Sequence, residues 1–166
     1  MTPSRFAKIK QVLAQRQSDM AVVTDFVHKS RNLSAVVRTA DAVGIQTVHA
    51  ALSEKEFYAF HGTAKGSHQW VDVTRYDNIE QALQPVLAQN MAVIAADVAD
   101  GCIDYREFDY TQPFALLLGA ERKGVSAAAK AQVGQFVRIP MMGMVESYNV
   151  SVAAGIILSE ACAQRT

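Results

Sequence analysis

An arginine in an apolar segment is the first residue whose surroundings suggest chemistry. Arg38 lies in NLSAVVRTADAVG, residues 32–44, where most of the neighbours are leucine, valine or alanine. A charge buried in such company is costly unless it is paired, so we expect an anion beside it. A phosphate or carboxylate of a ligand would supply that anion. Asp41, three residues along the same predicted helix, and Glu121, in a glycine-flanked loop, are alternatives within the chain.

A second candidate site is the segment IPMMGMVESYNVSVAAGIIL, residues 139–158. A buried strand ends at Pro140, and a methionine-rich loop that contains Glu146 follows it. Ser147 or Asn149 then offers a side-chain oxygen that can cap the apolar helix. A strand that runs into such a loop before a helix of small residues predicts a ligand site. A plain buried strand, loop and helix would produce the same pattern.

Several common chemistries lack their signatures in this chain. There is no G-x-G-x-x-G and no G-x-x-x-x-G-K-[ST], which excludes a standard dinucleotide site and a P-loop. There is no G-x-S-x-G elbow, and the histidines lack the spacing of metal ligands, so we expect no metal site. The two cysteines, Cys102 and Cys162, form no cluster and are predicted to be free thiols in a reducing cytoplasm.

The net charge of the whole chain is zero, but its N-terminal part is basic and the rest is acidic. Half of the 166 residues are hydrophobic and 19% are charged, which indicates a compact globular protein. Residues 1–40 hold seven Lys or Arg against two Asp, a net of +5, and the other 126 residues hold nine against fourteen acids, a net of −5. A basic N-terminal end predicts contact with phosphates, and a solvated helix face is the alternative. We expect no membrane span and no secretory signal.

The candidate residues must be positioned by alternating strands and helices. We predict strands over residues 20–27, 46–52, 70–75, 91–96, 114–118 and 135–139. We predict helices over residues 4–16, 33–43, 54–61, 78–90, 126–132 and 149–158. This alternation favours one domain, residues 1–166, of the α/β class, with a mostly parallel sheet and helices on both faces.

Helix ends and loops locate the candidates within this fold. Asn32 and Gly44 have the residue types that favour the N-cap and the C-cap of the helix over 33–43. Pro85 predicts a kink or an early stop in the helix over 78–90. Ligands of parallel sheets bind beyond the carboxyl ends of the strands. The site is therefore expected where the loops that follow strands meet, namely residues 28–32, 97–101, 119–124 and 140–149.

Three of these segments together resemble the motifs of a known family. NLSAVVRTADAVG, LLLGAERKGVS (residues 116–126) and IPMMGMVESYNVSVAA are similar, in order and spacing, to the three motifs of the SPOUT methyltransferases of the TrmH type. The resemblance covers essentially the whole chain. It implies transfer of a methyl group from S-adenosylmethionine to a ribose 2′-hydroxyl of RNA, and it is closest to members that modify a D-loop guanosine of tRNA. The alternatives are a ribosomal RNA substrate, or a cofactor- or RNA-binding module without turnover.

The resemblance also implies a fold and a set of site residues. The C-terminal segment is expected to form a deep trefoil knot, in an obligate cytoplasmic homodimer whose active sites are shared between subunits. The implied catalytic residues are Asn32, Arg38, Glu121, Ser147 and Asn149. The implied cofactor contacts lie at Ala96, Leu118, Gly119, Ile139, Met141 and Tyr148. RNA contacts are predicted at Arg5, Lys8, Arg16, Lys29 and Arg31.

Two positions depart from the family pattern. Tyr148 stands where the family usually has leucine, and its ring can still pack on an adenine. The chain ends at Thr166, whereas similar members continue with a helical RNA-binding extension. Arg38 is expected to hold a substrate phosphate and to stabilise the forming alkoxide. A guanidinium is a donor only, so full proton abstraction by Arg38 is chemically harder.

Overall fold

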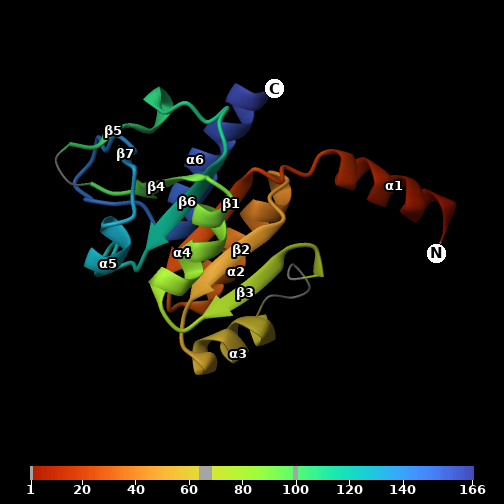
Figure 1. Cartoon of the computed structure of the whole chain (residues 1–166), viewed down its shortest axis with the longest axis horizontal. Coiled ribbons are helices and arrows are strands. Elements are labelled where there is room, and N and C mark those ends of the chain that lie inside the picture. The colour runs from red at the N-terminus through yellow and green to blue at the C-terminus, as the bar shows by residue number, and fades with distance from the viewer. Residues whose placement is uncertain (1, 64–68, 99–100) are drawn as a thin grey trace.

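The computed structural model describes residues 2–63, 69–98 and 101–166, and a parallel sheet forms its centre (Figure 1). In this part of the chain, seven strands lie in the order β3-β2-β1-β6-β4-β7-β5, and all neighbours run parallel. Their bounds are β1 Met20–Asp25, β2 Thr47–Ala51, β3 Asp72–Tyr76, β4 Ala92–Ala96, β5 Ile103–Asp104, β6 Phe114–Gly119 and β7 Gln135–Arg138. The predicted α/β class with a mostly parallel sheet is confirmed.

Helices cover both faces of this sheet. Residues of α2, α3 and α6 share one hydrophobic core, and residues of α4 and α5 share the other. The bounds are α1 Pro3–Ala14, α2 Ser30–Ala42, α3 Glu54–Thr63, α4 Ile79–Ala88, α5 Ala127–Lys130 and α6 Val150–Arg165. No helix within the described ranges has both the length and the hydrophobicity to cross a bilayer.

The central strands β1 and β6 are mostly apolar because both of their faces are buried. Val22 and Leu116 lie in one core, and Val23 and Leu117 lie in the other, since successive side chains of a strand point to opposite faces. The two strands pair in register, which places Asp25 beside the last residue of β6 at the carboxyl edge of the sheet.

Several element boundaries differ from the predicted ones. The short β5 and the 3₁₀ turn η2, Tyr105–Glu107, were not predicted, because two or three residues give no readable period. The helix α2 begins at Ser30, so Asn32 lies in its first turn and Lys29 is the N-cap. Pro85 does not stop α4, which continues to Ala88. Within the predicted acidic loop over 97–101, residues 99–100 lie outside the described residues.

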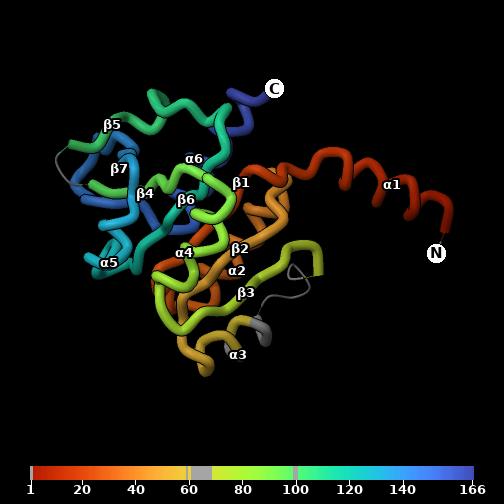
Figure 2. Tube along the Cα trace, in the orientation of Figure 1, coloured from red at the N-terminus to blue at the C-terminus, as the bar shows by residue number. Residues whose placement is uncertain are grey.

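The helix α1 extends away from the body of the protein (Figures 1 and 2). None of its residues is buried, and Phe6 and Leu13 of its predicted apolar stripe are 50% and 62% exposed. The chain re-enters the body next to the end of α2, where Gly44 has a φ of +82°. A Cβ on Gly44 would lie 2.6 Å from the carbonyl oxygen of Gln15, so only glycine permits this close crossing.

Candidate cofactor cavity and active site

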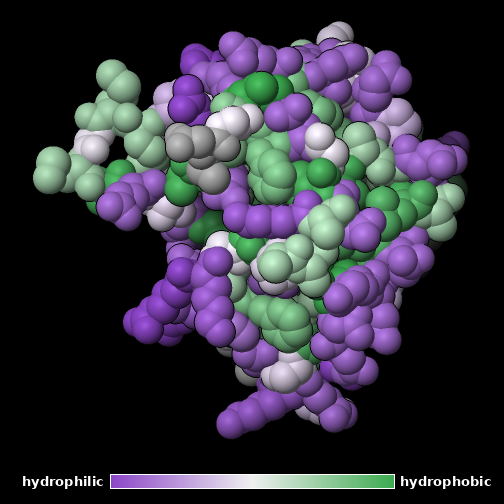
Figure 3. Space-filling view, turned by 60° about the vertical axis from the view of Figure 1, so that its left-hand side comes forward, coloured by the Kyte–Doolittle hydropathy of each residue, from purple (hydrophilic) through white to green (hydrophobic). Residues whose placement is uncertain are grey.

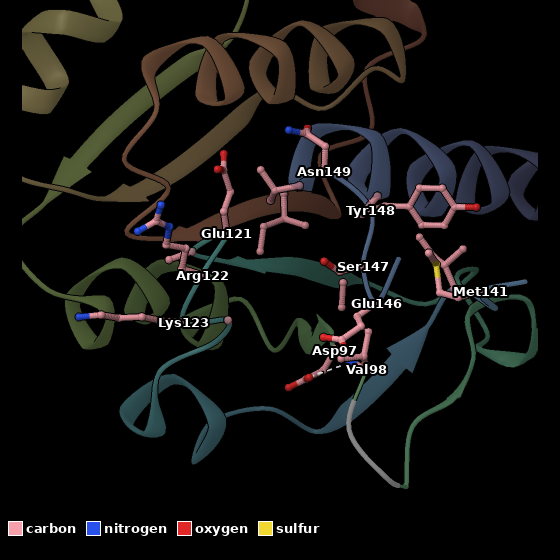
Figure 4. A pocket seen from close by; sticks show the side chains of 18 of the residues that line it. Asp97, Val98, Glu121, Arg122, Lys123, Met141, Glu146, Ser147, Tyr148 and Asn149 are labelled. Atoms are coloured by element: carbon pink, nitrogen blue, oxygen red, sulfur yellow. Dashed lines mark hydrogen bonds between the residues drawn. The ribbon is translucent and has the colours of Figure 1, made fainter. Parts of the chain in front are cut away.

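A cavity of about 560 Å³ opens at the carboxyl ends of β4, β6 and β7, beside the start of α6 (Figure 4). This is where a parallel sheet is expected to bind a ligand, and the volume is in the range of small-molecule sites. The loops after the three strands form its walls. The structure places in this lining every position that the resemblance implies for the cofactor, namely Ala96, Leu118, Gly119, Ile139, Met141 and Tyr148.

The loop after β6 folds back tightly over the end of its own strand. Ala120 donates its N–H to the carbonyl of Gly124 at 3.0 Å, and Gly124 donates to the carbonyl of Ala120 at 2.8 Å. A Cβ on Gly119 would lie 2.3 Å from the carbonyl carbon of Gly124 and 2.4 Å from the nitrogen of Val125. Glycine at position 119 is therefore needed for this turn, which presents Glu121 to the cavity.

Asn149 is the N-cap of α6, one of the two capping residues predicted. Its Oδ1 accepts from the backbone N–H and the hydroxyl of Ser151, at 2.9 and 2.7 Å. Its Nδ2 donates to Oδ1 of Asn32 at 3.3 Å, which joins α6 to α2. Nδ2 of Asn32 is buried and has no acceptor in the described part of the chain, so one donor remains for a ligand. Ser147 and Asn149 both line the cavity (Figure 4).

Arg38 is not paired with either of its expected partners. Glu121 forms an ion pair with Lys29, and Asp41 lies 2.8 Å from Arg16. Arg38 is exposed on α2, does not line the cavity, and has no ion pair among the described residues. The expectation of a buried Arg38 is therefore wrong. The apolar side of α2 faces the core, and Arg38 lies on the other side of the helix. The buried residues of α2 are Leu33, Val36, Val37 and Ala40.

Most of the basic residues predicted to contact RNA are exposed, namely Arg5, Lys8, Lys29 and Arg31. Arg16 differs, because its side chain is only 11% exposed. Its guanidinium donates to the carboxylate of Asp41 at 2.8 Å and to the carbonyls of Trp70 and Ile45 at 2.7 and 3.0 Å. These contacts tie the segment after α1 to α2 and to the segment before β3. Arg16 thus has a structural task that sequence reasoning did not predict.

Two acidic residues of the cavity wall were not among the predicted site residues. Asp97 directly follows β4 and forms an ion pair with Lys130 of α5 at 3.0 Å. Glu146 precedes the capping segment of α6 and lies near Asp97 and Ser147 (Figure 4). The signal in the sequence was the place of Asp97, since acids directly after a buried strand lie at the ligand-binding edge.

Comparisons with known proteins agree with the motifs. The family model of the SpoU rRNA Methylase family matches residues 19–159. The tRNA (guanosine(18)-2′-O)-methyltransferase of Escherichia coli (strain K12) is 43% identical over 165 residues, which are 99% of this chain and 72% of the relative. The crystal structure of the A. aeolicus TrmH/SpoU tRNA modifying enzyme is similar with a TM-score of 0.88 and 38% identity, over 98% of this chain and 83% of that one.

A structure that contains the cofactor is also similar. The SpoU methyltransferase AviRb from Streptomyces viridochromogenes, in complex with AdoMet, has a TM-score of 0.80 and 29% identity, over 90% of this chain and 59% of that one. The match to the family model begins before β1 and ends within α6, so it includes the whole sheet and the cavity. The family resemblance inferred from three motifs is confirmed. By sequence and by fold, the chain belongs to the SpoU rRNA methylase family.

Proposed function

We propose that this protein is an S-adenosylmethionine-dependent RNA methyltransferase that acts on a ribose 2′-hydroxyl, with a guanosine of tRNA as its substrate in the cytoplasm. The observation that carries the proposal is that one cavity contains every implied cofactor position together with Glu121, Ser147 and Asn149. The substrate class is supported by the E. coli relative, a tRNA (guanosine(18)-2′-O)-methyltransferase that is similar over 99% of this chain.

The cavity suits S-adenosylmethionine in its size and its chemistry. Leu118, Val137 and Ile139 give apolar walls for an adenine, and the carboxylate of Glu146 places negative charge near a cationic ligand. When bound, the cofactor supplies a methyl group activated by its positively charged sulfur. The AdoMet complex of AviRb supports this choice of cofactor.

Polar residues in the cavity lining and next to it would position the ribose and stabilise its oxygen. The free Nδ2 of Asn32 can donate to the nucleotide, and Asn149 holds Asn32 in place. Lys29 fixes Glu121, which supports the loop after β6. The guanidinium of Arg38 only donates hydrogen bonds, so Arg38 acts by stabilising negative charge on the 2′-oxygen and by holding a phosphate. Alignment of the hydroxyl with the methyl group supplies a further part of the acceleration.

A homodimer is part of the same proposal. Apolar side chains near the cavity are exposed in the single chain, namely Met142 at 98%, Met144 at 100%, Val145 at 65%, Tyr148 at 42% and Val152 at 48%. Figure 3 shows hydrophobic side chains exposed between hydrophilic ones on one face of the molecule. Exposed apolar surface of this kind supports a protein interface. Because Arg38 does not line its own cavity, we propose that Arg38 of the partner subunit completes each site.

Transfer of a labelled methyl group from S-adenosylmethionine to tRNA tests the activity. We expect labelling of a guanosine ribose by the wild-type protein, with ribosomal RNA fragments as the competing substrate. Arg38→Ala should bind the cofactor normally and lose about 100-fold or more in single-turnover rate, because stabilisation of the oxygen is removed. A wild-type protein that binds the cofactor but methylates no RNA would contradict the proposal, as would an Arg38→Ala protein at the wild-type rate.

Mixed dimers test whether the sites are shared. Arg38→Ala and Glu121→Ala subunits would each be inactive alone at limiting cofactor. If Arg38 acts across the interface, each mixed dimer has one intact site, and random mixing restores about a quarter of the wild-type rate. If Arg38 acts within its own chain, every site keeps a defect and mixing restores nothing.

A further inference from the structure

We propose that Asp25 is a positioning residue for the loop that follows β6, and through this loop for the cofactor cavity. The inference rests on the proposed function, because the task it assigns to Asp25 is cofactor binding. Asp25 is the last residue of β1 and is 2% exposed. Its Oδ2 accepts the backbone N–H of Ser126 at 2.7 Å, across 101 residues of chain.

The contact between Asp25 and Ser126 has to offset the burial of a carboxylate. A buried charge is unfavourable unless it is paired or hydrogen-bonded, and Asp25 takes part in no ion pair in the part of the chain that the structure describes. A hydrogen bond from a backbone N–H to a carboxylate is charge-assisted, and 2.7 Å is at the short end of its range. The link is therefore stronger than a neutral hydrogen bond.

Asp25 and Lys29 hold the same loop at two places. The register of β1 and β6 puts Asp25 beside Gly119, where the loop leaves the sheet. The loop then turns back and reaches Ser126, whose N–H bonds to Asp25. Lys29, in the segment after β1, pairs with Glu121 in the middle of the loop. One short segment, residues 25–29, thus holds both the middle and the end of a loop that is far away in sequence.

Correct placement of this loop determines one wall of the cavity. Residues 118–124 line the cavity in succession. The loop packs so closely on Gly119 that an added Cβ would overlap the backbone of Gly124 and Val125. If Ser126 is released, the end of the loop can lift from the strand, and the wall loses its shape. We therefore expect a loss of cofactor affinity that exceeds the loss in the rate of the chemical step.

Substitutions at both ends of the contact separate the hydrogen bond from the charge. Asp25→Ala removes the acceptor, and Asp25→Asn keeps an oxygen that can accept the same N–H. At the other end, Ser126 has a φ of −66°, which proline adopts without strain, so Ser126→Pro removes the donor and the cap hydroxyl, and its ring carbon also takes the place of the hydrogen that faces Asp25. Ser126→Ala is its matched control, because it loses the cap hydroxyl but keeps the N–H.

The readouts are cofactor affinity by calorimetry, KM and kcat for methyl transfer, and hydrogen exchange of the amides in residues 120–126. Asp25→Ala and Ser126→Pro should each weaken cofactor binding roughly tenfold or more, raise the KM for the cofactor more than they lower kcat, and speed exchange in the loop. Asp25→Asn and Ser126→Ala should stay within about threefold of the wild type. The double variant Asp25→Ala/Ser126→Pro should be no worse than the single ones, since both remove one contact.

A control for general destabilisation is available at the other end of β1. Asp19 directly precedes β1, at the amino end of the strand, and its carboxylate pairs with Arg165 at 2.8 Å. Asp19→Asn should lower stability without changing cofactor affinity or exchange in the loop. Wild-type affinity in Asp25→Ala and Ser126→Pro would overturn the inference, as would an Asp25→Asn variant as defective as Asp25→Ala. A wild-type protein with no cofactor affinity would instead overturn the proposed function.

Discussion

Asn32 and Asn149 use their side-chain amides in different ways. Asn149 has its oxygen bonded to Ser151 and its Nδ2 bonded to Asn32, so its orientation is fixed from both ends. Asn32 accepts one hydrogen bond and keeps a buried donor without a partner among the described residues. An unpaired buried donor costs free energy that a ligand acceptor can recover. Of this pair, Asn32 therefore has the free donor that the proposed function requires for contact with a nucleotide.

His49 makes a separate prediction, on the acid sensitivity of the fold. It is 6% exposed in β2, and its Nδ1 lies 3.0 Å from the hydroxyl of Tyr76. Burial lowers the pKa of His49 below its ordinary 6.5, so the unfolded chain takes up this proton at a higher pH than the folded chain. The free energy of unfolding should be unaffected by this group above about pH 6.5, and below it should fall by at most about 1.4 kcal/mol per pH unit.

Urea unfolding at about pH 7.5, 6.5 and 5.5, at one protein concentration, measures this effect. His49→Asn keeps a polar partner for Tyr76 and removes the titrating ring, so its stability should fall less steeply over the same interval. The comparison uses the slopes, because the smaller side chain lowers stability at every pH. Equal slopes in the two proteins would assign the acid sensitivity to another group.

Sequence motifs predicted many of the residues around the cavity but not the contacts between them. Glu121, Ser147 and Asn149 could be named because their residue types recur at the spacing of a known family. The pairs Lys29–Glu121 and Asp25–Ser126 join positions about one hundred residues apart, and no local pattern records such a distance. The exposure of Arg38 was also predicted wrongly. Its apolar neighbours in the sequence indicated burial, but the exposure of a residue in α2 depends on which side of the helix faces the core.

At the level of elements, α1 depends on very few contacts. It has no buried residue, and Arg16 supplies the hydrogen bonds that join its end to Asp41, Ile45 and Trp70. We expect Arg16→Ala to release α1 and to leave the half-exposed Asp41 unpaired, which would lower stability by roughly 1–3 kcal/mol. Limited proteolysis should then cut within residues 14–18 much faster than in the wild type.

Two further substitutions, a conservative one at position 16 and one elsewhere on α1, serve as controls for this result. Arg16→Lys should rescue only in part, because an ammonium cannot bond three acceptors with the planar geometry of a guanidinium. Arg5→Ala, at an exposed position of α1, should weaken RNA binding and leave proteolysis unchanged. If Arg16→Ala weakens RNA binding while α1 stays as resistant to the protease as before, Arg16 contacts RNA directly and the structural role is refuted.

Long buried strands were the most predictable elements. The runs that form β1 and β6 consist of residues that suit a strand buried on both faces, and their positions were predicted to within about two residues. The two-residue β5 has no period to detect, and it pairs only with β7 at the edge of the sheet. The start of α2 was placed too late because Asn32 has the residue type of an N-cap, yet its side chain is used to bond Asn149.

On the scale of the whole molecule, the strand order could not be predicted from the sequence, and it bears on the knot that the family resemblance implies. β7 lies beyond β4, far from β1, whereas α6 packs in the core that contains α2. The chain must therefore return from β7, next to the edge strand β5, towards the middle of the sheet within residues 139–149. The knot that the family resemblance implies would need this segment to pass through a loop, which pattern rules alone do not favour.

Stretching single molecules from their two ends tests the knot. An unknotted chain of 166 residues should extend to at most roughly 580 Å after unfolding, and a knotted chain should stop measurably short of that length because the knot tightens instead of opening. Full extension of the intact chain would contradict the expected knot.

The sparse attachment of α1 has a consequence for how proteins of this kind can diversify. A helix with no fully buried residue, joined to the body through Arg16 and Gln17, can change almost every outward residue without disturbing the sheet or the cavity. Mutations there are free to drift and to explore other RNA shapes, while selection on the catalytic centre continues unchanged. Substrate preference and chemistry can thus evolve at different speeds within one polypeptide.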